Sequence, residues 1–367
     1  TITARDGSLC STATLLPWMD RADDLSELTA GALVLDPSTG QILAAAGDLS
    51  HHPAGTAITP FIYLAGFSRG LSPASLGWDI PGGEPVLGQV YQGPVRLRTA
   101  LVNDYLPPAR TLVNQVGIET ILRTSASLGL DFPSTSLLEK EFSLSPFTLS
   151  AAYGILAAEG TWVGQDITPS AGLTPAPAAS EGLDPAAVLL VTHADGSTWA
   201  DWSTPSSRLI LTPQLAYLVT DVLADKSARP DARVSTGWLD IGNQAAVRQA
   251  RTLDGSAAWT VGYTPLRVVT VFLSGAGGDS QSAADGLWSA LAQAAIQNLP
   301  PAAFEMPPGL VTVRVCDPSG MLPTDACRNE VEEIFLEGSQ PTQYDTLFQE
   351  IEINKETGQL ATVFTPI

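Results

Sequence analysis

Alternating apolar and polar residues predict strands near both ends of the main body of the chain. Residues 31–47 hold two apolar runs on either side of a turn around Pro37, which is the pattern of a β-hairpin. Residues 257–263 and 267–274 form a second pair of β-rich runs. Further strands are expected at residues 186–192, 207–211 and 310–315, with a last hairpin at residues 350–364.

Between these strands, longer apolar or amphipathic segments predict helices. A buried helix at residues 60–67 begins with Pro60, which suits a first helical turn. Residues 96–117 are helical, with a break expected at Pro107-Pro108. Strands at both ends with helices between them indicate an α+β fold, in which a mostly antiparallel sheet is flanked by helices. Three more helices are expected at residues 149–160, 213–224 and 282–299.

Changes in composition divide the chain of 367 residues into three parts. Residues 1–28 are polar and are interpreted as the remnant of a linker. Residues 29–300 form the main domain, with a surface excursion rich in Pro, Ala, Ser and Gly at residues 170–188. A Pro-rich stretch leads into a small β-rich C-terminal extension at residues 301–367. No long apolar run occurs, so no transmembrane segment is expected within this chain.

The net charge of −20 disfavours two classes of partner. An acidic surface repels nucleic acid and anionic lipid, so neither is expected to bind. No cofactor is expected, because the chain has no Gly-rich phosphate-binding loop. Cys316 and Cys327 lie close together in a turn-rich segment. An oxidising compartment would allow these two cysteines to form a disulfide.

Two pairs of polar residues could do chemistry, but the sequence favours solvated positions for both. His51-His52 could bind a metal ion, yet no third ligand stands near them in sequence, so an exposed loop is expected. Glu332-Glu333 could act as paired carboxylates in acid–base chemistry. Nothing in the sequence orients these two side chains, so an exposed face is expected for them as well.

Six phrases of the sequence, taken in order, carry a family resemblance. They lie at residues 35–44, 55–61, 70–73, 93–101 with 108–109, 259–265 and 316–342. Together they resemble the transpeptidase domain of bifunctional class A penicillin-binding proteins, over about residues 29–345. The resemblance implies the penicillin-binding, serine β-lactamase-like transpeptidase fold, which is an α+β domain, with a small C-terminal appendage.

The family's acyl-transfer chemistry depends on three side-chain motifs. Ser-x-x-Lys places the nucleophile and its base on one helix face, and Ser-x-Asn and Lys-Thr-Gly complete the proton relay and hold the substrate carboxylate. The corresponding positions in this chain hold, in order, Thr56 and Thr59, Asp104 and Leu106, and Arg248, Gln249 and Ala250. Every side chain that the chemistry needs is therefore replaced.

The lysines of the chain support this conclusion without any alignment. A Ser-x-x-Lys motif needs a serine three residues before a lysine. The chain has three lysines, Lys140, Lys226 and Lys355, and the residues three positions before them are Leu137, Leu223 and Glu352. No Ser-x-x-Lys therefore exists in any register, and none of the three lysines is followed by Thr-Gly.

The replacing residues leave several interpretations open. Thr56 could be a nucleophile, or its hydroxyl could cap the first turn of its own helix. Arg248 could pair with a substrate carboxylate, or it could be a surface arginine. Asp104 would repel such a carboxylate, and Leu106 suggests a partly closed cleft. The resemblance implies an oxyanion hole formed by the backbone N–H groups of Thr56 and Arg251.

The function expected from this pattern is a catalytically inactive, transpeptidase-like module of a peptidoglycan synthase, with a structural or interaction role in cell-wall assembly. The alternative is an active D,D-transpeptidase or carboxypeptidase that uses Thr56 as the nucleophile. The resemblance also implies a glycosyltransferase domain and a membrane anchor upstream of this chain, which would place the chain outside the cytoplasm. The expected partners are peptidoglycan or the machinery that makes it.

Overall fold

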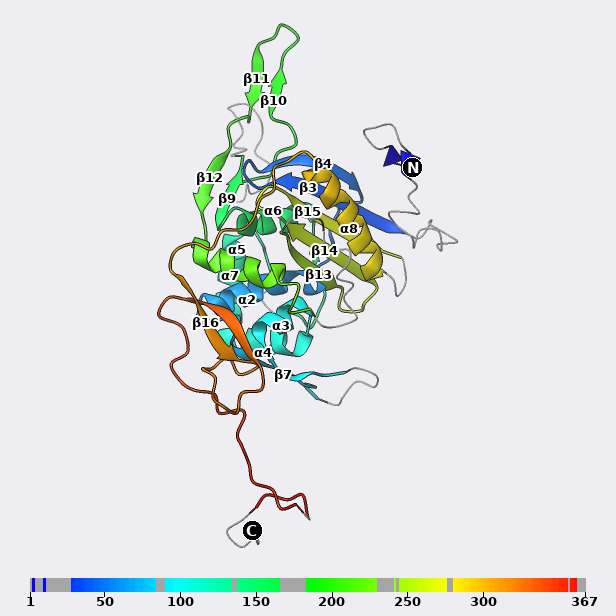
Figure 1. Ribbon diagram of the computed structural model, residues 1–367. Helices are drawn as coiled ribbons and strands as arrows, with labels where there is room; N and C mark the ends of the chain where they lie inside the picture. The colour runs from blue at the N-terminus through cyan, green and yellow to red at the C-terminus, as the bar shows by residue number, and fades with distance from the viewer. Residues whose placement is uncertain are drawn as a thin grey trace.

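A five-stranded antiparallel sheet forms the centre of the computed structural model (Figure 1). Its strand order is β13-β14-β15-β3-β4. These strands are β13 (Ala246–Arg251), β14 (Ala257–Tyr263), β15 (Val268–Ser274), β3 (Thr29–Asp36) and β4 (Gln41–Gly47). Both predicted hairpins, β3–β4 and β14–β15, are confirmed. The structure describes residues 2–3, 9–10, 28–83, 90–133, 137–165, 183–229, 241, 244–275, 280–355 and 357–361.

Helices cover both faces of this sheet, as the α+β prediction requires (Figure 1). On one face, α8 (Ser280–Ile296) packs on β14 and β15 and buries Trp288. On the other face, α6 (Pro146–Ala157) packs on β3 and β15. The largest of the three apolar clusters among the described residues lies on this second side. It also includes the buried helix α2 (Thr59–Phe67), with Pro60 in its first turn as predicted.

The helical region at residues 96–117 breaks at a different place from the one predicted. Its first helix, α3 (Leu97–Val102), ends before Asn103, and α4 (Leu106–Val116) begins three residues later. Pro107 and Pro108 lie in the first turn of α4, where the missing backbone N–H groups have no partner to lose. The break therefore falls in the three-residue loop 103–105. Two more helices complete this side, α5 (Ile118–Ser127) and α7 (Pro213–Ala224).

Short two-stranded sheets surround the central body. The predicted strand at residues 186–192 is observed only as β10 (Leu190–Thr192), which pairs with β11 (Thr198–Asp201) in a protruding hairpin (Figure 1). The hairpin predicted at residues 350–364 is observed, among described residues, as one antiparallel bridge between Ile353 and Leu360. Most of residues 1–28 and 170–188 lies outside the described residues. The other short strands are β1 (Ile2–Thr3), β2 (Leu9–Cys10), β5 (His52–Pro53), β6 (Leu76–Asp79), β7 (Gly93–Arg96), β8 (Ser143–Leu144), β9 (Thr161–Gly164) and β12 (Ser206–Leu209).

The C-terminal hairpin consists of β16 (Leu310–Cys316) and β17 (Glu330–Leu336). Cys316 and Cys327 are joined by a disulfide at its end, with their Cα atoms 5.8 Å apart. The sequence missed β17, because its charged residues obscure the alternation of apolar positions. Its inward-facing residues include Phe335, which is 2% exposed.

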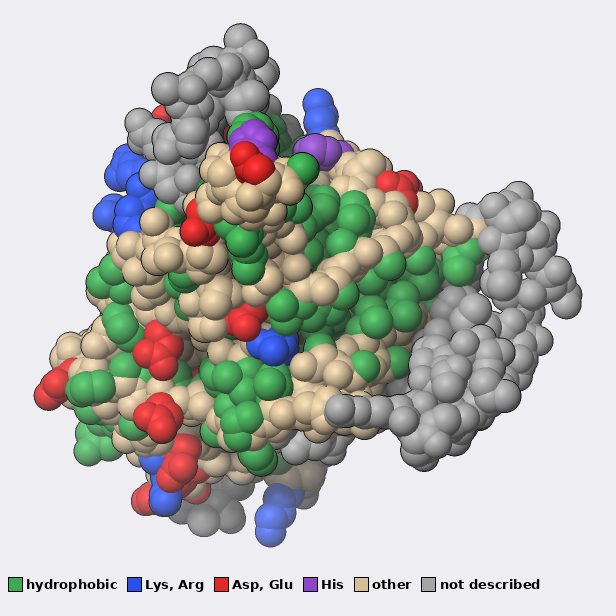
Figure 2. Space-filling model, turned by 90° about the horizontal axis from the view of Figure 1, so that it is seen from above, with side chains coloured by type: hydrophobic (Ala, Val, Ile, Leu, Met, Phe, Trp, Pro, Cys, Tyr) green, Lys and Arg blue, Asp and Glu red, His purple; other side chains and the backbone are tan. Residues whose placement is uncertain are grey.

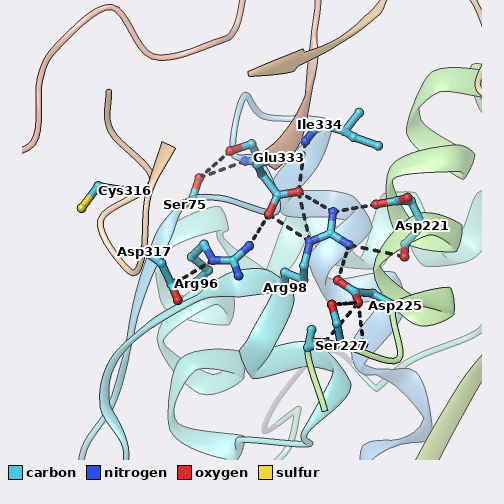
Figure 3. Close-up of polar contacts among 12 residues, drawn as sticks. Ser75, Arg96, Arg98, Asp221, Asp225, Ser227, Cys316, Asp317, Glu333 and Ile334 are labelled. Atoms are coloured by element: carbon cyan, nitrogen blue, oxygen red, sulfur yellow. Dashed lines mark hydrogen bonds and ion pairs between the residues drawn. The ribbon is translucent and has the colours of Figure 1, made fainter. Parts of the chain in front are cut away.

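A buried carboxylate attaches this hairpin to the rest of the molecule (Figure 3). Glu333 of β17 is fully buried, so the expectation of an exposed Glu332-Glu333 pair is wrong for Glu333. Its carboxylate accepts hydrogen bonds from Arg96 Nη1 at 2.7 Å and from Arg98 Nε at 2.9 Å. These two arginines flank the start of α3 and are themselves buried. The hairpin is therefore tied to α3 through ion pairs shielded from water.

Further carboxylates complete the ion-pair network around the two arginines (Figure 3). Arg98 also pairs with Asp221 at 2.6 Å and with Asp225 at 3.2 Å, which come from α7 and its C-terminal end. Arg96 pairs with Asp317 at 2.8 Å. Segments separated by more than two hundred residues thus meet at one buried cluster, and removal of one member leaves charges uncompensated.

Replacement of the buried carboxylate tests this cluster. We expect Glu333→Gln to lower the free energy of unfolding by about 3 kcal/mol, because two buried guanidinium groups lose their shared partner. Glu332→Gln, at the exposed neighbouring position, is the matched control and is expected to change it by no more than about 0.5 kcal/mol. Urea denaturation measures both variants. Equal effects of the two changes would contradict a buried role for Glu333.

Candidate functional site

A cleft of about 290 Å³ lies where the sequence resemblance locates the catalytic motifs. Its walls come from four parts of the chain: the 3₁₀ helix η2 (Gly55–Ile58), the loop between α3 and α4 with the start of α4, the turn between β13 and β14, and the β6–β7 hairpin. Among the residues that line it are Thr56, Asp104 and Leu106. The fold therefore brings three of the predicted site residues to one cleft.

The backbone of η2 lies directly against the end of β13. Gly55 has φ of 52°, and a Cβ atom at this position would lie 2.0 Å from the carbonyl oxygen of Arg251. Only glycine fits such a close approach with this backbone conformation. The contact places the side chain of the next residue, Thr56, beside Arg251. One turn later, the Thr59 hydroxyl donates to the carbonyl oxygen of Thr56 at 2.9 Å.

The loop between α3 and α4 directs a carboxylate into the same place. Asp104 has φ of 58°, in the left-handed region that few residues other than glycine adopt, although Asp and Asn tolerate it best. The preceding Asn103 fixes the loop, because its side-chain amide donates to the carbonyl oxygens of Thr99 at 2.9 Å and Ala228 at 2.7 Å. The backbone strain at Asp104 is offset by the contacts that its carboxylate makes.

The partner of this carboxylate is Arg248, and both interpretations offered for Arg248 are wrong. The side chain is neither on the surface nor available to a substrate, because it is 1% exposed. Its Nη2 forms an ion pair with Asp104 Oδ1 and also donates to the carbonyl oxygen of Thr56 at 3.1 Å. Its Nη1 donates to the carbonyl oxygen of Leu101. The guanidinium group thus joins β13, η2 and the end of α3.

The hydroxyl of Thr56 is held by two neighbours. It donates to Asp104 Oδ2 at 2.9 Å and accepts a hydrogen bond from the backbone N–H of Arg251 at 3.1 Å. No side chain caps η2, so the prediction that this hydroxyl caps its own helix is wrong. The Arg251 N–H, expected to serve an oxyanion hole, donates to the Thr56 hydroxyl. Thr56, Asp104 and Arg248 therefore form one hydrogen-bonded cluster.

The two residues that follow Arg248 in β13 do not reach this cluster. Arg248 pairs with Val261 of β14. Successive side chains of a strand lie on opposite faces. Gln249 therefore faces α8, where it donates to Asp285 at 2.5 Å, and Ala250 is buried in the core beneath the cleft. Of the three residues that replace Lys-Thr-Gly, only Arg248 reaches the cluster.

Sequence reasoning missed a carboxylate that organises the rim of the cleft. Glu141 accepts a hydrogen bond from the backbone N–H of Gly55 at 3.1 Å and another from that of Leu253. Asp79, which is 3% exposed, lines the opposite wall. Neither residue belongs to a short motif, and the partners of Glu141 are 86 and 112 residues away in sequence. Only the tertiary structure reveals their positions.

The structure gives no support for a metal site among the residues it describes, where no group of three His, Cys, Asp or Glu side chains could hold an ion. The expectation of an exposed histidine loop is wrong for His52, which is 7% exposed. Its ring stacks on Phe272 with centroids 3.9 Å apart. Its Nε2 lies 3.1 Å from the carbonyl oxygen of Asp48. His52 therefore packs on the central strand β15, whereas His51 is exposed.

Comparison with known proteins agrees with this geometry. Residues 306–350 match the family described as penicillin-binding protein 1A, C-terminal domain. Penicillin-binding protein 1A of Clostridium botulinum is 26% identical over 354 residues, covering 86% of this chain. The protein of the same name from Escherichia coli is 22% identical and also covers 86%. The chain is related to penicillin-binding protein 1A. It spans 39% and 48% of the length of these two curated relatives.

Solved structures confirm the predicted transpeptidase-like fold. Penicillin-binding protein 1A from Haemophilus influenzae matches 94% of this chain and 61% of its own, with a TM-score of 0.68 and 16% identity. PonA1 from Mycobacterium tuberculosis, solved in complex with penicillin V, matches 81% of this chain with a TM-score of 0.60 and 16% identity. The likeness to penicillin-binding protein 1A thus extends beyond the C-terminal hairpin to the central sheet and its helices. No helix among the described residues is long and apolar enough to cross a membrane.

The buried carboxylate of Asp285, in α8, predicts that the free energy of unfolding depends on pH. Burial raises the pKa of Asp285 to about 6 from an ordinary 3.8, although Gln249, Gln281 and Thr260 donate to it. A raised carboxyl pKa means that the folded state binds the proton more tightly than the unfolded chain. The resulting stability is present below pH 3.8 and is lost as the pH rises through about 6.

We expect Asp285→Asn to remove this dependence. Relative to the unchanged protein, the variant should gain about 3 kcal/mol of stability between pH 3.5 and pH 7, because the pKa of Asp285 is about 6 in the fold and 3.8 in the unfolded chain. Asp131→Asn, at an exposed position, is the control and should follow the unchanged protein at every pH. Urea denaturation over this pH range measures all three proteins. Parallel profiles for Asp285→Asn and the unchanged protein would contradict the assignment.

Proposed function

We propose that this chain is a catalytically inactive transpeptidase-like module of a peptidoglycan synthase. The observation that carries the proposal is the ion pair between Asp104 and Arg248, which fills the position of the family's proton relay. Both residues are needed to hold η2, α3 and β13 together, so they act as structural elements. A module of this kind contributes shape and contacts to cell-wall assembly.

The absence of a base beside the nucleophile position supports this proposal. In the family, a lysine one turn after the nucleophile takes its proton. Here that position holds Thr59, whose hydroxyl donates to a backbone carbonyl and cannot accept a proton at neutral pH. Loss of a general base typically slows a reaction by about 10² to 10⁴. The methyl group of Thr56 also restricts its rotamers and crowds the approach of an acyl group.

The charge of the cleft argues against retained binding of the family's substrates. Penicillins and the peptides that transpeptidases bind carry a carboxylate, whereas this cleft is lined by Asp79, Asp104 and Asp254. The one arginine that lines it, Arg251, has a side chain 51% exposed and 3.9 Å from Asp104. A carboxylate that enters the cleft would thus meet more negative than positive charge.

The alternative function is acyl transfer by Thr56. It is favoured by one observation, the 2.9 Å hydrogen bond from the Thr56 hydroxyl to Asp104, which is the geometry of a nucleophile with an acceptor. Transfer of the proton to Asp104 would, however, cost its ion pair with the buried Arg248. The structural interpretation of the cluster is therefore preferred.

The wider setting of the module follows from its relatives. A longer protein that resembles penicillin-binding protein 1A along its whole length would carry a glycosyltransferase domain and a membrane anchor, with this module outside the cytoplasm. The disulfide between Cys316 and Cys327 agrees with an oxidising compartment. Peptidoglycan, or the proteins that synthesise it, would then be the partners of the module.

The proposal predicts that penicillin will not acylate this protein. Incubation with a fluorescent penicillin, followed by a denaturing gel and intact-mass measurement, should show no stoichiometric adduct. Thr56→Ser combined with Thr59→Lys should remain unlabelled as well, because Asp104 and Arg248 still occupy the relay. A stoichiometric adduct on Thr56 that is lost in Thr56→Ala would establish the alternative function instead.

A further inference from the structure

The open edge of the central sheet is a surface that the proposed function does not use. β4 is the last strand of the sheet order, so among the described residues one side of it has no neighbouring strand in that sheet. Residues Leu43–Gly47 are exposed, and the side chain of Leu43 is 43% exposed. Seen from the side on which β3 and β4 lie in Figure 1, the molecule shows broad bands of hydrophobic side chains (Figure 2).

The hydrogen bonds of β4 show which of its backbone groups are open. Asp48 donates to the carbonyl oxygen of Ala30 at 2.8 Å, on one side of the facing pair Gly31 and Gly47. That pair is therefore a non-hydrogen-bonded one, and pairs alternate along an antiparallel ladder. Two residues before Gly47, Ala45 faces Leu33, and this is again a non-hydrogen-bonded pair. The N–H and C=O groups of Ala45 consequently point away from β3, toward the open edge.

One end of this edge already pairs with an added segment. The N–H of Ile42 donates to the carbonyl oxygen of Ala186 at 2.9 Å, and the N–H of Ala186 donates to the carbonyl oxygen of Gly40 at 3.0 Å. These bonds form a parallel bridge between Gln41 and Ala186. The edge of β4 therefore accepts an extended chain over its first residues, and residues 43–47 continue it.

The side chains of β4 lack the features that usually protect an exposed edge. Natural sheets use lysines, prolines or inward-pointing charges there. Residues 41–47 read Gln-Ile-Leu-Ala-Ala-Ala-Gly, with no charge and no proline. The register shift near Leu43 is the single irregularity of the strand. The small side chains of Ala44, Ala45 and Ala46 allow another backbone to approach closely.

Charge around the edge identifies the kind of partner. Neither residues 28–54, which contain β4, nor residues 183–207, which contain the segment paired with its start, have a lysine or an arginine. They contain five aspartates, Asp36, Asp48, Asp184, Asp195 and Asp201, of which Asp36 pairs with Arg267 at 3.0 Å. A second copy of this chain would bring the same negative charge to the edge and would be repelled.

We infer that the edge of β4 is a docking site for an extended, basic segment of a partner protein. The segment adds to the sheet as a sixth strand through hydrogen bonds to the backbone of Ala45 and Gly47. Its apolar side chains lie on Leu43 and on Val188, which is 55% exposed, and its lysines or arginines face Asp48 and Asp184. The site lies on the opposite side of the sheet order from β13 and the cleft, so it does not depend on whether the cleft is catalytically inactive.

The test uses a dye-labelled peptide, Lys-Val-Thr-Val-Thr-Lys, and fluorescence anisotropy with the full chain. Ala45→Pro removes the outward N–H without touching a bond to β3, and it should weaken binding at least tenfold. Ala45→Val keeps the N–H and is the matched control, with binding expected within about twofold of the unchanged protein. Thermal unfolding of both variants shows whether the fold is retained.

Changes in the peptide provide a second measurement that does not depend on the stability of any variant. N-methylation at alternate residues should abolish binding, because it removes strand hydrogen bonds, and replacement of both lysines by glutamate should weaken it at least tenfold. A peptide affinity that is unaffected by Ala45→Pro or by the N-methyl groups would overturn the proposal. A complete lack of peptide binding would also overturn it. If the unchanged protein forms a dimer that Ala45→Pro dissociates, the edge is instead assigned to a second copy of the chain.

Discussion

The ion pair between Arg248 and Asp104 is the interaction on which the centre of the structure depends. Arg248 is buried, and without Asp104 its charge would have no carboxylate beside it. The same guanidinium group donates to the backbone carbonyl oxygens of Thr56 and Leu101. One side chain therefore connects η2, the end of α3 and the edge strand β13. The cluster therefore depends on both side chains keeping their charge.

A second buried network of ion pairs, around Glu333, attaches the C-terminal hairpin to α3. Arg98 lies at the beginning of α3, and Asp104 follows the end of that helix. Glu333 therefore anchors one end of α3 and Arg248 the other. Removal of the whole hairpin would leave Arg96 and Arg98 buried next to fewer carboxylates, so the hairpin is part of the stable fold. The interaction role proposed for this chain is therefore better tested by point changes than by truncation.

The central fold could be predicted from the sequence because it depends on local patterns. The turn at Pro37 and the apolar runs at residues 257–274 specify hairpins wherever the rest of the chain lies. The partners of Arg248 and Glu333 could not be predicted in the same way, because charged residues are usually exposed, and burial needs partners that are distant in sequence. The absence of a Ser-x-x-Lys motif could be read from the sequence, since it concerns residue identity. The ion pair between Asp104 and Arg248 could not, since it concerns geometry.

A double-mutant cycle on Asp104 and Arg248 tests the account most directly. Asp104→Asn keeps a residue that tolerates the left-handed backbone, and Arg248→Met keeps an unbranched side chain of similar length. Urea denaturation of the two single variants and the double variant yields the coupling free energy. A structural ion pair predicts a coupling of about 2 kcal/mol or more, with each single change strongly destabilising. Effects that add to within about 0.5 kcal/mol would contradict the claim that this pair holds the centre together.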